Sequence, residues 1–134
     1  MDADQAKGGG VKYIMFRREF VPLILDGTKG LTIRKKARLK PGERFAMRYW
    51  SGAPYRSKQV EFATATAWIV EPIKISMLRI ESPRGELSRR FIARKDGFKG
   101  WAAMRSFFNQ THGLPFEGWM HNWEELTPTV KEVA

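Results

Sequence analysis

The chain has 134 residues, no cysteine and a formal net charge of +10 at neutral pH. This length fits a single domain with its own hydrophobic core. The absence of cysteine excludes a disulfide framework and a thiolate metal site, and no segment is apolar and long enough to predict a membrane span. We expect one cytoplasmic domain over residues 11–127, a disordered polar leader over residues 1–10 and a frayed tail over residues 128–134.

The first half of the chain predicts strands separated by a short helix and a basic loop. Val, Ile, Phe, Thr and aromatic residues predict strands over residues 11–16, 44–50 and 59–70. We expect Pro72 to end the long third strand and residues 73–80 to form another. Within residues 44–50, Phe45 and Met47 alternate with Arg44 and Arg48, which is typical of a half-buried strand with a basic outer face.

The second half predicts helices followed by a final strand. Residues 82–90 are polar and predict an exposed loop, and residues 86–93 predict a short helix. A longer helix is predicted over residues 99–111, because Trp101, Met104 and Phe108 recur at helical spacing and Gly113 lies just beyond. Residues 119–123 predict the last strand. Together these elements predict an α+β fold.

The turn over residues 25–34 is the most informative stretch. Apolar residues at helical spacing lead to Asp26-Gly27, a helix stop, because glycine readily adopts the left-handed conformation. Lys29, Thr32 and Arg34 follow within six residues. In a strand, Thr32 and Arg34 would share one face. An ammonium, a hydroxyl and a guanidinium gathered here suit an anionic or carbonyl-bearing ligand.

This turn resembles the motif of the ASCH family, small domains of the PUA-like superfamily, in which Gly-x-Lys-x-x-Thr-x-Arg follows a short helix. Three further segments fit the same family order: Pro41-Gly42-Glu43, Asp96-Gly97-Phe98 before a helix, and Phe116-Glu117-Gly118 with Trp123. The resemblance covers residues 12–125. It implies a small PUA-like β-barrel, partly open, with two or three flanking helices.

The resemblance also implies a site. Some ASCH members are amidohydrolases of N4-acetylcytidine that use a Lys, a Thr and a carboxylate, and the matching residues here are Lys29, Thr32 and Asp96. Burial would lower the pKa of Lys29 so that it could act as a base, and Thr32 would attack the acyl carbonyl. In those enzymes the acid is a glutamate, one methylene longer than Asp96.

The charge distribution favours nucleic acid as the partner. Residues 29–58 contain ten Lys or Arg and one acid, Glu43. Basic residues interleaved with aromatics suit single-stranded RNA, because bases stack while cations bind phosphates. The residues expected to contact nucleic acid are Arg34, Lys35, Lys36, Arg38, Arg48, Trp50, Tyr55 and Arg56. The residues Tyr49, Trp68, Trp101, Phe107 and Phe108 are expected in the core.

Several functions remain open on these observations. The leading interpretation is a domain that binds RNA, single-stranded nucleic acid or a modified nucleoside. The first alternative is an amidohydrolase, and the second a ribonuclease, for which no histidine pair is evident because His112 and His121 are expected to be structural. A basic module that binds an acidic protein is the third. We expect a monomer without metal or cofactor.

Overall fold

The computed structural model describes residues 11–129 and has an α+β fold, with a seven-stranded sheet, three α-helices and one short 3-10 helix. The predicted leader and most of the predicted tail lie outside these residues. The elements in chain order are β1 (Lys12–Met15), η1 (Arg18–Phe20), α1 (Val21–Leu25), β2 (Leu31–Arg34), β3 (Arg44–Trp50), β4 (Gln59–Ile75), β5 (Ile80–Ser82), β6 (Gly85–Leu87), α2 (Arg89–Lys95), α3 (Trp101–Thr111) and β7 (Phe116–Pro128).

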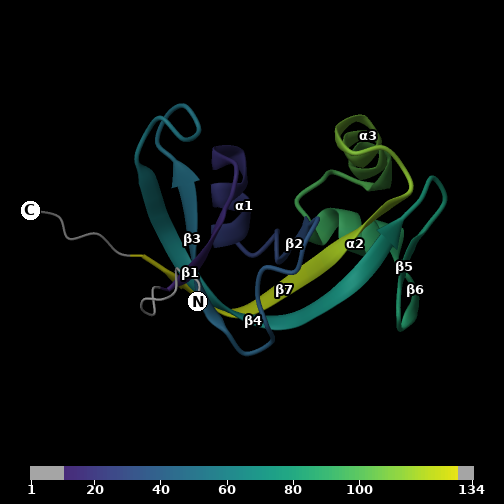
Figure 1. Ribbon diagram of the computed structural model, residues 1–134, viewed down its shortest axis with the longest axis horizontal. Helices are drawn as coiled ribbons and strands as arrows, with labels where there is room; N and C mark the ends of the chain where they lie inside the picture. The colour runs from purple at the N-terminus through teal and green to yellow at the C-terminus, as the bar shows by residue number, and fades with distance from the viewer. Residues whose placement is uncertain (1–10, 130–134) are drawn as a thin grey trace, which may run out of the picture.

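The two longest strands, β4 and β7, form the centre of the sheet. They pair antiparallel and curve side by side across the molecule (Figure 1). β3 pairs antiparallel with the first part of β4, β1 pairs in parallel with β3, and β2 pairs antiparallel with β7. β5 and β6 extend the far end of β4. Within residues 11–129 these pairings do not close into a ring, so the α+β class is confirmed but the sheet is not closed into the small, partly open barrel that the resemblance implied.

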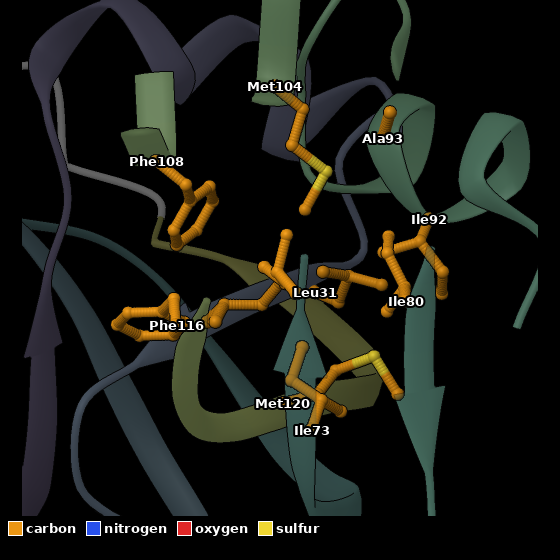
Figure 2. Close-up of a cluster of buried hydrophobic side chains, with 11 residues drawn as sticks. Leu31, Ile73, Ile80, Ile92, Ala93, Met104, Phe108, Phe116 and Met120 are labelled. Carbon is orange, nitrogen blue, oxygen red and sulfur yellow. The ribbon is translucent and has the colours of Figure 1, made fainter. Parts of the chain in front are cut away.

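Two hydrophobic cores occupy the two ends of this curved sheet. One contains Ile14, Ile24 and Phe45 and lies between α1 and the strands β1, β3 and β4. The other contains Leu31, Met104 and Phe116 and lies beneath α2 and α3 (Figure 2). β2 contributes its buried Leu31 and Ile33 to this second core. The link from α1 to β2 therefore joins the two halves of the molecule.

The predicted turn after α1 is confirmed. Pro22 lies in the first turn of the helix, where its missing N–H leaves no donor unsatisfied. Gly27 has a φ of +87°, the left-handed conformation expected at a helix end. The backbone N–H of Thr28 donates to Oδ1 of Asp26 at 2.8 Å, and that of Lys29 donates to the carbonyl of Leu23 at 2.9 Å. These bonds fix the direction in which the Lys29 side chain leaves the turn.

The expected break at Pro72 is wrong. β4 continues through it to Ile75, and Pro72 lies opposite Trp119 of β7. The pairing of β4 with β3 ends at Thr66 and that with β5 begins at Lys74. Ala67 still bonds to the backbone of Gly42 and Glu43. Across residues 68–73, β4 is therefore paired with β7 alone, as far as the described residues show. A proline that lacks an N–H is tolerated where a strand faces no second neighbour.

The placement of Trp68 in the core is also wrong, because this side chain is 57% exposed. Ala67 pairs with Trp123 and Ile69 with Asn122, so Trp68 is the extra residue of a β-bulge in β4. A bulge interrupts the alternation of inward and outward side chains. The other residues expected in the core do pack there: Phe108 is buried, and Tyr49, Trp101 and Phe107 are half-buried against the two cores.

In the second half of the chain, the predicted elements differ from the observed ones mainly in where they begin and end. The expected strand over residues 73–80 is wrong, because β4 ends at Ile75 and β5 begins at Ile80. The expected loop over residues 82–90 contains the end of β5 and all of β6, which are three-residue strands too short to produce a sequence pattern. α2 begins at Arg89, because the hydroxyl of Ser88 accepts the N–H of Phe91 and caps the helix. The predicted helix α3 is confirmed, and β7 is longer than expected. No described helix is both long and apolar enough to cross a membrane.

Candidate functional site: a polar pocket between the two cores

A pocket of about 310 Å³ lies where the two halves of the molecule meet. Its lining comes from the end of β1, η1, the turn before β2, β2 itself, the segment after α2, and α3. Four predicted site residues line it together: Lys29, Thr32, Arg34 and Asp96. Lys35 lines it as well. Residues from two segments that are distant in the sequence, 29–35 and Asp96, thus lie in one cavity.

Lys29 and Asp96 form a buried ion pair at the inner end of the pocket. Their side chains are 3% and 6% exposed, and Nζ of Lys29 lies 2.6 Å from Oδ1 of Asp96. The ammonium also donates to the backbone carbonyl of Asp96 at 2.7 Å and to that of Leu31 at 2.8 Å. An ammonium has three N–H donors. All three donors of Lys29 are therefore used within the protein.

Burial opposes the charge on both members of this pair. It lowers the pKa of Lys29, and the attraction of Asp96 partly offsets this effect. It raises the pKa of Asp96, against the attraction and hydrogen bond of Lys29. Loss of solvation penalises the charged form of either group. The pair is consequently held together by mutual neutralisation in a site where neither charge would persist alone.

Gly97 allows this arrangement. Its φ is +95°, and a Cβ atom added there would lie 3.0 Å from the ring of Phe20 and 3.3 Å from Cδ of Lys29. A side chain at this position would therefore be strained and would also press on the lysine. The Asp-Gly-Phe sequence after α2 has a physical reason: Asp96 pairs with Lys29, Gly97 turns the chain against it, and Phe98 lines the pocket.

Thr32 and Arg34 share one face of β2, as predicted. Nε of Arg34 donates to Oγ1 of Thr32 at 3.0 Å, and Nη2 donates to the carbonyl of Met15 at 2.8 Å. Burial, and then the charge of Arg38, lowers the pKa of Arg34 to about 10, so the guanidinium stays charged at neutral pH. Oγ1 of Thr32 thus accepts a hydrogen bond from Arg34, which leaves the O–H of the threonine free to donate a hydrogen bond to a ligand.

Aromatic rings form much of the wall. Phe16, Phe20, Phe98, Phe107 and Phe108 all line the pocket. Nζ of Lys29 lies 4.7 Å from the ring centre of Phe20, and the guanidinium carbon of Arg34 lies 5.3 Å from that of Phe16. Cations over aromatic faces are stabilised electrostatically. The pocket combines flat apolar walls with a few fixed polar groups, as small-molecule sites commonly do.

The other predicted contacts for nucleic acid do not line this pocket. Lys36 and Arg38 are exposed in the loop after β2, where the backbone N–H of Arg38 donates to Nε2 of buried His121. Arg48 lies over the ring of Tyr13 and donates to Oε1 of Gln59. These three residues belong to surfaces outside the cavity.

Trp50 is the last residue of β3, and Tyr55 and Arg56 belong to the connection between β3 and β4. The rings of Trp50 and Tyr55 are 5.1 Å apart, and Tyr55 is 88% exposed. Its φ of +64° is uncommon for a bulky residue and carries a conformational cost. Arg56 is exposed beside it. This exposed aromatic pair lies at a second location, distinct from the pocket.

Most of the residues that line the pocket were not predicted as site residues. Among them are Arg17, for which the sequence predicted no role, Phe107, which was expected in the core, and His112, which was expected to be structural. His112 is the residue that ends α3. A sequence signal existed only for its position at a helix end. Its approach to Lys35 depends on how α3 packs against β2, which the local sequence does not encode.

Within residues 11–129, no group of three His, Asp or Glu side chains is placed to hold a metal ion. The pocket polar groups are instead two cationic side chains, a hydroxyl and a neutralised carboxylate, with further cations nearer the surface. Such a set suits hydrogen bonding to a polar or anionic ligand. Comparison of the chain with family models, curated proteins and solved structures found no match.

Proposed function

We propose that this chain is an ASCH-type, PUA-like domain that binds RNA or a nucleotide in the pocket between its two cores. One observation carries the proposal: Lys29, Thr32, Arg34 and Asp96, drawn from two distant segments, line one cavity with aromatic walls. Nucleobases bind to proteins by stacking on aromatic rings and by hydrogen bonds along their edges. A volume of about 310 Å³ is within the usual range of ligand sites.

The hydrogen bonds of Lys29 support binding over catalysis. A base must have a free lone pair, whereas Nζ of Lys29 donates three hydrogen bonds, to Leu31 and twice to Asp96. Lys29 in this arrangement is an ammonium that orders the pocket. Thr32 and Arg34 then present the hydroxyl proton and the guanidinium to a ligand.

The amidohydrolase remains a second candidate because of the electrostatics of the same pair. Burial lowers the pKa of Lys29 and raises that of Asp96, which favours transfer of the proton from the ammonium to the carboxylate. A neutral Lys29 could take the hydroxyl proton of Thr32 as its oxygen attacks an acyl carbonyl. The amide C–N bond would then break, Lys29 would return the proton to the departing amine, and water would hydrolyse the acyl-threonine ester. Asp96, although shorter than the glutamate of the resembling enzymes, still reaches Lys29 at 2.6 Å.

Binding is tested by fluorescence anisotropy with a labelled single-stranded RNA of mixed sequence between about 50 and 300 mM salt. Affinity should fall steeply as salt rises, because phosphate contacts release counterions. Thr32→Val, which removes the hydroxyl at nearly constant volume, should weaken binding. Arg90→Gln, which removes an exposed charge of α2 outside the pocket, should not. Affinity independent of salt and equal in all three proteins would overturn the proposal.

Catalysis is tested by incubating N4-acetylcytidine with the wild type, Lys29→Ala and Thr32→Val, followed by chromatography. Release of cytidine by the wild type but by neither variant would support the enzyme. Because Lys29→Ala leaves Asp96 buried without its counter-charge and so destabilises the fold, Thr32→Val is the decisive variant. Release by Thr32→Val at the wild-type rate would remove the threonine nucleophile. No release by any protein would leave the pocket as a binding site.

A further inference from the structure

Two cationic side chains and one histidine, each from a different segment, line the outer part of the pocket. Arg17 follows β1, Lys35 follows β2 and His112 ends α3. All three line the cavity and all three are exposed, whereas Lys29, Thr32 and Asp96 at its inner end are 2–5% exposed. The pocket therefore has a neutralised Lys29–Asp96 pair at its inner end and an outer rim of exposed side chains. We refer to Arg17, Lys35 and His112 as the rim.

A continuous set of aromatic rings places the rim residues relative to one another. The guanidinium carbon of Arg17 lies 5.5 Å from the ring centre of Phe107, and Nζ of Lys35 lies 5.3 Å from that of Phe116. The ring of His112 is centred 4.7 Å from Phe116. Phe108 connects the set, with its ring centre 5.4 Å from that of Phe107 and 5.1 Å from that of Phe116. Lys35 and His112 thus flank a single ring.

The rim has little internal neutralisation. Among the residues that line the pocket, Asp96 is the one acid, and it is bound to Lys29. Arg17 approaches Glu19 at 3.8 Å, but both side chains are more than 60% exposed, and such pairs contribute little. Among residues 11–129, no acid forms an ion pair with Lys35 or His112. The cationic groups of Arg17 and Lys35 are therefore free to bind an anionic group of a ligand at the mouth of the pocket.

We propose that the rim binds the phosphate of the ligand while its base enters the aromatic pocket. This inference rests on the proposed function and specifies the ligand class: a nucleoside monophosphate, or a nucleotide within an RNA chain, rather than a free nucleoside. Arginine and lysine are the usual phosphate ligands in proteins, and a histidine can donate from its ring N–H. In the interior, Arg34 is a cation without an acidic partner, but it donates hydrogen bonds to Thr32 and to the carbonyl of Met15. The exposed side chains of the rim are therefore the ones placed to bind a phosphate.

The test compares nucleosides with their monophosphates by isothermal titration calorimetry at low salt. The pairs are cytidine, uridine, adenosine and guanosine, each against its 5′- and 3′-monophosphate. For a base that binds, the better monophosphate should bind about tenfold more tightly than the nucleoside, a gain expected from charge-assisted contacts. Lys35→Gln and Arg17→Gln should each weaken binding of the monophosphate more than binding of the nucleoside, and so reduce this preference.

Lys36→Gln is the matched control, because Lys36 is the exposed neighbour of Lys35 in the same loop but does not line the pocket. It should retain the full preference for the monophosphate. Equal affinities for nucleoside and monophosphate, or an equal loss in Lys35→Gln and Lys36→Gln, would overturn the rim while leaving the nucleotide pocket standing. If no nucleoside or monophosphate binds, the proposed pocket itself is overturned, and the rim with it.

Discussion

The ammonium of Lys29 and the carboxylate of Asp96 lie 2.6 Å apart although 67 residues separate them in the chain. Lys29 belongs to the turn between α1 and β2, and Asp96 ends α2. Their contact connects the turn after α1, which packs on the first core, to the end of α2, which covers the second core. The pocket exists because these two segments meet, so its geometry depends on the correct packing of both halves.

Asp96→Asn should destabilise the protein strongly, because it leaves the ammonium of Lys29 buried without a counter-charge. The expected loss in the free energy of unfolding is about 3–5 kcal/mol. Urea denaturation followed by tryptophan fluorescence measures it. The double variant Lys29→Met with Asp96→Leu removes both charges and should be less destabilised than the single variant. A single variant as stable as the wild type would show that the pair carries no such constraint.

Gly97→Ala should destabilise the fold more than Gly42→Ala. Both glycines have a positive φ, +95° and +89°, so both variants bear the backbone cost of alanine in this region, of order 1–3 kcal/mol. A Cβ atom at residue 97 also meets Phe20 and Lys29, whereas nothing lies within 4 Å at residue 42. Thermal unfolding compares them. Equal losses would mean that Phe20 and Lys29 adjust without cost.

Stability should fall as pH decreases below about 6.5 because of His121. Burial, the largest cause, lowers the pKa of this histidine, and its Nε2 accepts the N–H of Arg38 at 3.0 Å, which requires the neutral ring. The unfolded chain therefore binds a proton that the folded chain resists, and stability is lost as pH falls from the unfolded pKa toward the folded one.

His121→Gln removes this titration, and the urea midpoint measures its effect. The midpoint of the wild type should drop more than that of the variant between about pH 7 and pH 5, a window set by the ordinary histidine pKa. Parallel curves for the two proteins would show that His121 titrates alike in the folded and unfolded states. Carboxylates that titrate at lower pH are common to both proteins and cancel in the comparison.

Tyr55→Ala should weaken binding of single-stranded RNA with little effect on stability, because the ring is 88% exposed and packs on Trp50 alone among aromatic residues. Loss of one stacked base corresponds to about 1–3 kcal/mol of binding free energy. Trp68→Ala is the control, since it removes another exposed aromatic ring from a different strand. Equal effects of the two changes would argue against a specific stacking role for Tyr55.

Much of the candidate site could be predicted because its residues lie in short motifs with local causes. The helix stop at Gly27 and the alternation along β2 place Lys29, Thr32 and Arg34 without any knowledge of distant contacts. Asp96 was identified through resemblance rather than through pattern. Its contact with Lys29 is a tertiary relationship.

The features that the sequence did not predict depend on tertiary packing, which the local sequence does not determine. β4 continues through Pro72 because the strand has a neighbour on one side only at that point. Trp68 is exposed because it is the extra residue of a β-bulge. Neither condition is visible in the strand's own residues. Arg17 and His112 join the pocket because β1 and α3 converge on β2 from opposite ends of the chain. Sheet order and helix packing, rather than propensity, determined these positions.

The most direct test of the central claim is a nuclear magnetic resonance titration of the 15N-labelled protein with single-stranded RNA. The account predicts the largest shifts at the backbone amides of Lys29–Lys35 and of Asp96–Phe98, the two segments that meet at the pocket. Saturating shifts there would locate the ligand in the cavity. Shifts confined to residues 36–44 and 51–58, with the amides of the pocket unchanged, would contradict this account. They would show that RNA binds to those basic loop segments outside the pocket.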